Sequence, residues 1–308
     1  MKKLKIVTLL AIGFVLILQP LSAAKINAVK VGSKINVYID DKFFTSYIYS
    51  SDEEYPFFFP VNGPLSGGSV TSMRNGAYPH HTSLFFACSE VNGGDYFDYI
   101  GGLDKEGLER GRIISVNVEI VKEGGDSVVI SDECIWSRPG ALSPIKDTRK
   151  ITITGPSATI RQIDFEITLD MLIDVHIRKT GHSLFCARMA ADLSEKNGGI
   201  IINAEGVINA KENFGKKSAW IDYFGKRGSV IEGLAIMQHP SNPWYPSPWF
   251  SRDYGFFAPG PMNWPENGEE TFIKKGEKRS FRFRVLVHGG DQAEAKIAEA
   301  FEKFRNEK

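Results

Sequence analysis

Ile163-Asp164-Phe165-Glu166-Ile167-Thr168-Leu169-Asp170 alternates apolar and polar residues one by one. Residues 114–120 and 280–287 show the same alternation. Because successive side chains of a β-strand point to opposite faces, a period of two residues places one face on a core and the other toward solvent. These stretches therefore predict antiparallel sheets, each with one buried face.

Shorter strand patterns lie between these stretches. Residues 34–40 and 43–49 flank a turn at Asp40-Asp41, and Gly124-Gly125-Asp126 forms a hairpin turn between two further strands. Many strands with glycine-rich turns indicate an all-β fold. We therefore predict one large β-sandwich domain over residues 25–308.

The last residues of the chain are the only ones that predict a convincing helix. Asp291 is a candidate N-cap with Glu294 three residues later, and Ile297, Phe301 and Phe304 recur at helical spacing. This amphipathic pattern predicts one C-terminal helix that lies across a sheet or covers its edge.

Charge and cysteine content argue against two classes of protein. The 37 basic and 37 acidic residues give a formal net charge of +0 without a basic stripe, which disfavours a nucleic-acid partner. Cys88, Cys134 and Cys186 are odd in number and widely spaced, unlike a disulfide framework. Each lies in an apolar run, so we expect three buried thiols, with one disulfide as the alternative.

The N-terminus has the pattern of a signal peptide. Basic residues at positions 2, 3 and 5 precede an apolar run over residues 6–18, and Ser22 and Ala24 suit cleavage after Ala24. The run is shorter than a comfortable bilayer span, so an uncleaved anchor is the minor alternative. We expect segment 1–24 to be removed and the mature protein to be secreted or periplasmic.

Residues 239–257 form a proline-rich, aromatic stretch. Prolines at positions 240, 243, 246 and 248 prevent a helix and disfavour a sheet interior, so an extended loop is expected. Aromatic faces beside fixed polar groups suit a cleft for a ring-shaped ligand. A loop that buries its aromatic residues over a core is an equally open interpretation. The candidate site residues in this stretch are His239, Asn242, Trp249, Arg252, Asp253 and Tyr254.

Four other places carry residues suited to chemistry. The tandem His80-His81 could bind a metal or transfer protons near neutral pH, although local hydrogen bonding is the plainer role. A turn position is the plainer interpretation for Lys179 and the bland one for Glu205, and a core position is equally plausible for Trp220. The remaining candidates are Asp222 and Tyr223 beside Trp220, and His288 at the end of the last predicted strand. The mixture of aromatic, carboxylate and imidazole groups suits a neutral polyhydroxylated ligand, and no phosphate-loop, dinucleotide, zinc-protease or serine-hydrolase motif is present.

Taken in order, these motifs are similar to those of the bacterial proteins of the PmoA family, also called methane oxygenase PmoA. The resemblance is carried by Pro79-His80-His81-x-Ser83-Leu84, Gly111-Arg112-Ile113, Lys179-x-Gly181, Asn203-x-Glu205-Gly206, Gly215-Lys216-x-x-x-Trp220-x-Asp222-Tyr223-x-Gly225, His239-Pro240-x-Asn242-Pro243, Pro248-Trp249-x-x-Arg252-Asp253-Tyr254-Gly255 and Arg284-Val285-Leu286-x-His288. It implies a secreted β-sandwich protein of carbohydrate-degrading bacteria. We expect a large sandwich similar to the galactose-mutarotase type.

The leading hypothesis is acid–base processing of a glycoside or sugar ring, because such chemistry needs a paired acid and base. His81 would be the acid or base, and Glu205 or Asp222 the opposing carboxylate. The catalytic candidates are His80, His81, Lys179, Glu205, Asp222 and Arg252, and the substrate-binding candidates are Trp220, Tyr223, Asn242, Trp249, Asp253 and Tyr254.

Two alternatives belong to other classes. One is a non-catalytic glycan-binding protein. The other is a metal-dependent oxidoreductase, as the family label hints, which would hold a divalent copper or iron ion through His80 and His81, with His239 or His288 as a further ligand. The leading hypothesis needs no cofactor, and its ligand would be a small carbohydrate or an oligosaccharide.

Overall fold

The computed structural model describes residues 24–76, 78–98, 102–103, 107, 109–262 and 270–307. Residues 1–23, which hold nearly all of the expected signal peptide, lie outside this range. Within the described residues, no helix is both long and apolar enough to cross a membrane.

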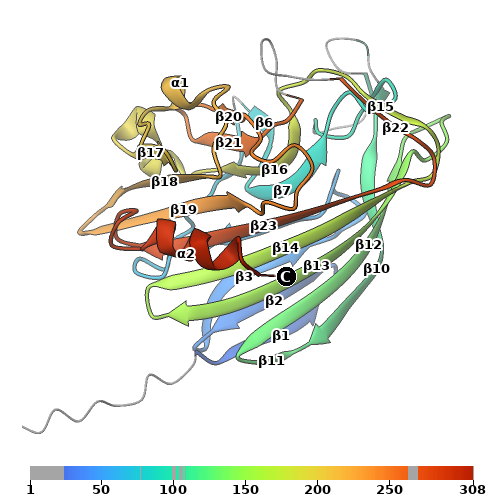
Figure 1. Ribbon diagram of the computed structural model, residues 1–308. Coiled ribbons are helices and arrows are strands. Elements are labelled where there is room, and N and C mark those ends of the chain that lie inside the picture. The colour runs from blue at the N-terminus through green and yellow to red at the C-terminus, as the bar shows by residue number, and fades with distance from the viewer. Residues whose placement is uncertain are drawn as a thin grey trace, which may run out of the picture.

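Two large antiparallel sheets make up the fold (Figure 1). The nine-stranded sheet has the order β11 (Gly124–Gly125), β1 (Ile26–Val31), β2 (Lys34–Ile39), β3 (Lys42–Ile48), β4 (Phe57–Val61), β7 (Leu84–Cys88), β16 (Ser183–Arg188), β21 (Phe256–Pro259) and β20 (Trp249–Ser251). The eight-stranded sheet has the order β10 (Arg112–Lys122), β12 (Ser127–Ser137), β13 (Ile145–Ser157), β14 (Ile160–Met171), β23 (Lys278–Gly289), β19 (Val230–Gln238), β18 (Trp220–Arg227) and β17 (Ile200–Asn203). The prediction of an all-β fold with a large sandwich is confirmed.

Smaller elements flank these sheets. Three two-stranded pairs join β5 (Met73–Asn75) to β6 (Tyr78–Thr82), β8 (Gly94–Asp95) to β9 (Glu109–Arg110), and β15 (Val175–Ile177) to β22 (Thr271–Ile273). The helices are the short α1 (Ala210–Asn213) and the C-terminal α2 (Ile297–Phe304), with 3₁₀ turns at Ala191–Leu193 and Glu195–Asn197.

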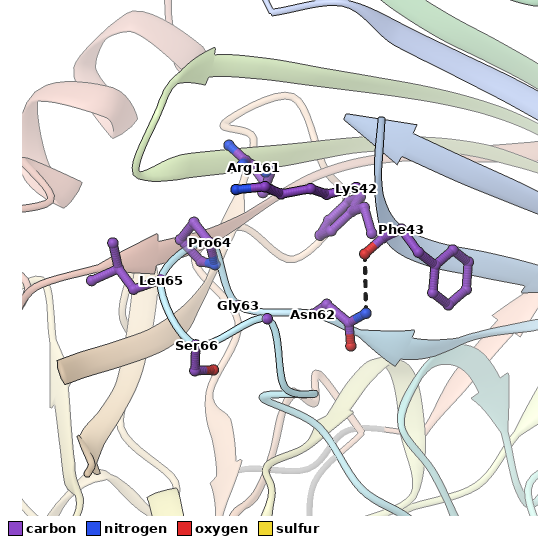
Figure 2. A pocket seen from close by; sticks show the side chains of 10 residues that line it. Lys42, Phe43, Asn62, Gly63, Pro64, Leu65, Ser66 and Arg161 are labelled. Atoms are coloured by element: carbon purple, nitrogen blue, oxygen red, sulfur yellow. Dashed lines mark hydrogen bonds between the residues drawn. The ribbon is translucent and has the colours of Figure 1, made fainter. Parts of the chain in front are cut away.

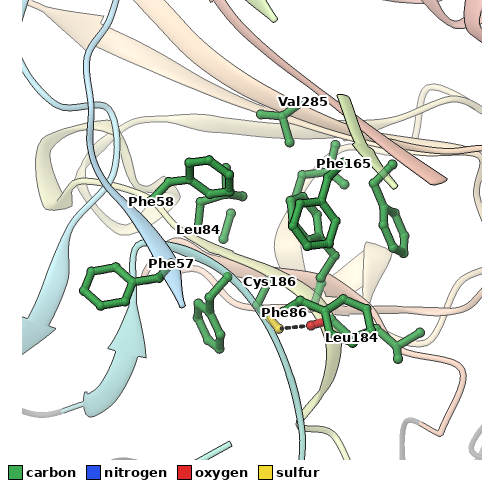
Figure 3. Packing of buried hydrophobic residues seen from close by; sticks show 14 of the residues in the cluster. Phe57, Phe58, Leu84, Phe86, Phe165, Leu184, Cys186 and Val285 are labelled. Atoms are coloured by element: carbon green, nitrogen blue, oxygen red, sulfur yellow. Dashed lines mark hydrogen bonds between the residues drawn. The ribbon is translucent and has the colours of Figure 1, made fainter. Parts of the chain in front are cut away.

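The core lies between the two sheets. Phe165 of β14 faces Phe58, Phe86 and Phe185 of the nine-stranded sheet, with ring centroids 6.5, 6.1 and 4.8 Å apart (Figure 3). The alternating stretch 163–170 therefore buries its apolar face as predicted, with Ile163, Phe165, Ile167 and Leu169 all buried. Aromatic pairs of this kind add about 0.5–1.5 kcal/mol each to the free energy gained from burial.

The three cysteines are free, buried thiols. Burial raises the pKa of each thiol, since the thiolate would lose its hydration. The expectation of buried thiols is confirmed.

The C-terminal helix is shorter than its sequence pattern suggests. Asp291 does form the expected cap, because its Oδ1 accepts hydrogen bonds from the N–H groups of Ala293 and Glu294, each at 2.9 Å. Lys296 then adopts a left-handed conformation with φ 56°, so the regular helix begins only at Ile297. Ile297, Phe301 and Phe304 pack with apolar residues of β18, β19 and β23, and α2 crosses the outer face of the eight-stranded sheet (Figure 1).

Candidate functional site

The tandem histidines lie in β6, which pairs with β5 outside the two large sheets and directly precedes β7. Ser83 separates the two strands and has φ 60°, a left-handed conformation that redirects the chain. Tyr55 holds the end of β6, since its hydroxyl donates to the His80 carbonyl at 3.0 Å. In Figure 1, β6 lies beside β16, β20 and β21 in the upper part of the molecule.

Four rings from three segments form a continuous stack, which we call the ring stack. Its members are Phe256, His81, Tyr78 and Tyr254, with successive centroids 4.2, 5.0 and 4.3 Å apart. Their planes deviate from parallel by 20° or less. Phe256 and His81 are buried, whereas Tyr78 and Tyr254 are partly exposed. The rings of His81 and Tyr254 are also only 6.0 Å apart, so the ring stack is compact rather than a linear column.

Arg188 of β16 runs alongside the ring stack. Its Nη1 is 3.3 Å from Nδ1 of His81, and its Cζ is 5.1 and 4.5 Å from the ring centroids of Tyr78 and Tyr254. Burial lowers the pKa of Arg188, and its three neighbouring tyrosines oppose this effect. Because an arginine stays protonated, Nη1 donates and the Nδ1 of His81 accepts.

His81 is held as a neutral imidazole by this environment. Burial is the largest cause that lowers the pKa of His81 well below its ordinary value, and the nearby His80, Arg188 and His182 lower the pKa further. With only 2 % of its surface exposed, His81 is poorly placed to exchange protons with a ligand.

His80 lies edge-on to His81, with the ring centroids 4.4 Å apart and the planes at 83°. Its Nδ1 is 3.4 Å from Oδ1 of Asp98, and Oδ2 of Asp98 accepts a hydrogen bond from Arg110 at 2.8 Å. The His80 side chain is 22 % exposed, far more than that of His81. His182 lies 5.6 Å from His80 and stacks on Phe97 at 4.7 Å. Three histidines thus meet at one place.

The loop that follows β20 brings Arg252, Asp253 and Tyr254 to the ring stack. Tyr223 of β18 anchors this loop, because its hydroxyl donates to the Asp253 carbonyl at 3.0 Å and accepts from the Glu195 N–H at 2.7 Å. The Arg252 guanidinium lies 4.2 Å from the ring centroid of Phe250. Burial raises the pKa of Tyr254 to about 12, so its phenol stays protonated at neutral pH.

Two clefts adjoin the cluster. One, of about 500 Å³, is lined by Phe214, Arg252, Asp253 and Lys196, among others. The other, of about 530 Å³, is lined by Arg110, Arg112 and Arg138, among others. The first cleft adjoins the cluster through Arg252, which contacts Tyr254, and the second adjoins it through Arg110, which contacts Asp98.

A smaller cavity of about 250 Å³ lies elsewhere, beside the loop that follows β4 (Figure 2). Lys42 and Arg161 point toward it across from Pro64, and Asn62 donates to the Phe43 carbonyl at 3.1 Å. Of the described residues that line it, none is a histidine or a carboxylate. This cavity is therefore separate from the histidine cluster.

Several predicted site residues are absent from the cluster. Trp220 and Asp222 do share a face of β18, as the strand period requires, but that face is the outer one, which α2 partly covers. Asp222 and His288 form a pair there, with Oδ1 and Nε2 2.9 Å apart and neither side chain exposed. An aromatic platform at Trp220 and a catalytic carboxylate at Asp222 are thus contradicted by burial.

Three predicted site residues of the proline-rich stretch support the fold instead of facing a ligand. Trp249 is fully buried and donates from Nε1 to the Ser218 carbonyl at 2.9 Å, which contradicts a ligand-stacking role. The Asn242 side chain is also used within the fold, since its amide donates a hydrogen bond to the Arg282 carbonyl and accepts one from the Arg282 N–H. His239 contacts the carbonyl of Glu307 near the C-terminus at 3.1 Å. The interpretation as core cover is correct for these residues.

Lys179 and Glu205 are both exposed, in two different loops. Lys179 lies three residues before His182, whereas Glu205 lies in the turn after β17, where its N–H donates to Oδ1 of Asn203 at 3.0 Å. No contact ties Glu205 to the ring stack among the described residues. Of the predicted acid–base partners, only the histidine pair is central to the cluster.

The four predicted metal ligands separate into three places. His80 and His81 are adjacent, His239 lies near the C-terminus, and His288 pairs with Asp222. Over the described part of the chain, no group of three or more His, Cys, Asp or Glu side chains has the geometry to hold a metal ion. The structure therefore contradicts a metal site that adds His239 or His288 to the tandem pair.

Sequence reasoning missed Tyr78, Asp98, Arg188 and Phe256 as members of this cluster. Tyr78 was within reach, since it directly precedes the Pro79-His80-His81 motif. Phe256 belongs to the aromatic stretch 239–257, but Arg188 had no such signal. The two residues meet because β16 pairs with β21 and places them opposite each other.

Residues 34–302 match a family model described as "Family of unknown function (DUF6807)". No curated protein sequence matches the chain at a significant level.

Among solved structures, the chain aligns with three carbohydrate-related proteins. A putative aldose 1-epimerase from Escherichia coli K12 gives a TM-score of 0.32 at 12% identity, over 86% of this chain and 98% of that one. A GalM/aldose epimerase homologue from C. elegans gives 0.34 at 9% identity, over 87% and 99%. The heparan sulfate lyase HepC from Pedobacter heparinus gives 0.29 at 8% identity, over 83% and 30%. At these TM-scores the likeness concerns general architecture, and a function for this chain must rest on its own side chains.

Proposed function

Because the chain belongs to DUF6807, a family of unknown function, we propose from the side-chain geometry that it performs acid–base chemistry on a saccharide at the histidine cluster. The observation that carries this proposal is the pair formed by His80 and Asp98. A carboxylate beside Nδ1 favours the proton on that nitrogen and fixes the ring, as in other acid–base histidines. We assign the transferred proton to Nε2 of His80.

The geometry favours His80 over His81 for this role. His80 is partly exposed and oriented by Asp98, which Arg110 holds in turn. His81 is buried, accepts a hydrogen bond from Arg188 and has a strongly lowered pKa. We therefore assign His81 to the support of the ring stack.

One member of the ring stack supports a saccharide as the ligand. The partly exposed Tyr254 lies beside the charged groups of Arg252 and Asp253, and sugar rings bind such combinations of aromatic and polar groups through apolar faces and hydroxyl groups. The protonated phenol of Tyr254 can also donate a hydrogen bond to a ring or leaving-group oxygen. These features match the carbohydrate setting that the resemblance to PmoA-family proteins implies, and export through segment 1–24 is part of the same proposal.

The test is turnover by wild-type protein and two variants. The mature protein is incubated with neutral and acidic oligosaccharides, and product is followed by new reducing ends, by absorbance of unsaturated sugars and by anomeric exchange. His80→Ala is expected to lower kcat by about 10²–10⁴, the usual contribution of a general acid or base. His176→Gln is the matched control, because His176 also pairs with a carboxylate, Glu270 at 3.3 Å, but is no part of the cluster.

Full turnover by His80→Ala on a proven substrate would contradict the proposal. If Tyr254→Ala abolished saccharide binding while no product ever formed, the cluster would be a non-catalytic glycan-binding site. A saccharide panel without binding or turnover would end the carbohydrate hypothesis altogether.

A further inference from the structure

Three arginine side chains converge on the cleft next to His80. Arg110, Arg112 and Arg138 line this cleft of about 530 Å³, which we call the arginine cleft. Among its described lining residues, Glu54 is the one carboxylate. Each arginine also has a carboxylate neighbour, which is Asp98 for Arg110, Glu54 for Arg112 and Glu109 for Arg138.

Strand pairing explains why the arginines meet. Arg112 begins β10 and pairs with Ser137, the last residue of β12, so Arg138 follows directly beside it. Arg110 ends the short β9, two residues before Arg112. Guanidinium groups from two neighbouring strand ends are thus directed to one place by backbone register.

Among the described residues, Arg112 and Arg138 form only long ion pairs with carboxylates of the protein. Nε of Arg112 is 3.5 Å from Glu54, and the Arg112 side chain is 41 % exposed. Arg138 is 3.6 Å from Glu109, and its hydrogen bonds to the Asn92 and Gly93 carbonyls involve neutral groups. Guanidinium groups prefer short, bidentate contacts with carboxylate, sulfate or phosphate oxygens, and these ion pairs are longer.

We propose that the arginine cleft binds an anionic substituent of the ligand, a carboxylate or a sulfate ester, so that the protein acts on acidic saccharides. The inference rests on the proposed function at His80. Arg110 connects the two sites, because it contacts Asp98 at 2.8 Å and Asp98 contacts His80 at 3.4 Å. One extended saccharide can therefore place a sugar ring at His80 and a charged group in the cleft.

Affinity electrophoresis of the mature protein tests the inference. The gels contain polygalacturonate or alginate for carboxylates, κ-carrageenan for sulfate esters, and galactan or fully methyl-esterified pectin as uncharged counterparts. We expect an acidic polymer to retard the wild type, and Arg112→Gln to weaken this binding about tenfold or more, because one charged contact is lost. Added salt should weaken it as well.

Two variants serve as controls. Arg112→Lys keeps the positive charge but lacks the planar guanidinium that makes bidentate contacts, so its affinity for the acidic polymer should lie between those of wild type and Arg112→Gln. Arg279→Gln removes a partly exposed arginine that pairs with Glu277 and does not line the arginine cleft, so it should bind as the wild type does.

The results separate this inference from the proposed function. The inference would be overturned if no polymer, or only the uncharged polymers, retarded the protein. It would also be overturned if polygalacturonate and fully methyl-esterified pectin retarded it equally. Unchanged binding by Arg112→Gln would also overturn it, and reduced turnover by His80→Ala on the bound saccharide would still support the acid–base proposal. Charge-dependent binding through Arg112 without any turnover would support the inference and contradict catalysis.

Discussion

Replacing Asp222 by Asn should destabilise the protein through a buried pair that lies away from the histidine cluster. Oδ1 of Asp222 is 2.9 Å from Nε2 of His288, and neither side chain is exposed. Breaking such a pair from one side costs about 3–5 kcal/mol, because the remaining group keeps its burial and loses its partner. At about 2–4 °C per kcal/mol in a chain of this size, Tm should fall by roughly 10 °C.

The effect should depend on pH. Burial is the largest single influence and lowers the pKa of His288, but the Asp222 carboxylate and the hydrogen bonds to the backbone of Gly289 and Gly290 together raise it by more, so the pKa of His288 is higher in the folded protein than its ordinary value. A raised histidine pKa stabilises the folded state fully below the unfolded pKa of about 6.5, and this stabilisation is lost as the pH rises through the folded pKa. Wild type should therefore lose stability relative to Asp222→Asn as the pH rises above that value.

Urea unfolding followed by tryptophan fluorescence at pH 6 and pH 9 measures both expectations. Asp170→Asn is the matched control, because Asp170 pairs with Lys278 at 3.0 Å on the same sheet but in an exposed position. Its loss should stay below about 1 kcal/mol. A loss of less than about 1 kcal/mol for Asp222→Asn at pH 6, or an equal loss at both pH values, would refute the reasoning.

Two further predictions concern the loop and the thiols. Tyr223→Phe removes the hydroxyl that joins the Glu195 N–H to the Asp253 carbonyl. The free energy of unfolding in urea should fall by about 1–3 kcal/mol, and saccharide binding at Tyr254 should weaken. Unchanged stability and binding would show that this anchor is dispensable. The three buried cysteines should be unreactive toward a thiol reagent in the folded protein and react together in urea, whereas one fast-reacting thiol under native conditions would contradict their burial.

Sequence alone determined the strands and the part of the candidate site that is contiguous in the chain. The alternation at 163–170 identified a buried face correctly because β14 lies inside the eight-stranded sheet. The same alternation at 114–120 did not: β10 is an edge strand with a register shift between Ser115 and Asn117, and Val116 is 56% exposed. The tandem His80-His81 was identified because both residues and Pro79 are neighbours in the chain. The two-residue side-chain period of a strand placed Trp220 and Asp222 on one face, but it could not say that α2 covers that face.

Tertiary structure decided which histidine is accessible and what surrounds it. His80 and His81 are adjacent in sequence, yet one lies beside Asp98 and the other is buried in the ring stack. That difference arises because β16 and β21 bring Arg188 and Phe256 together from positions 68 residues apart in the chain. Such long-range pairing depends on which distant strands become neighbours in the sheet. The pattern within one strand does not specify this, yet it sets the burial and electrostatics of the candidate site.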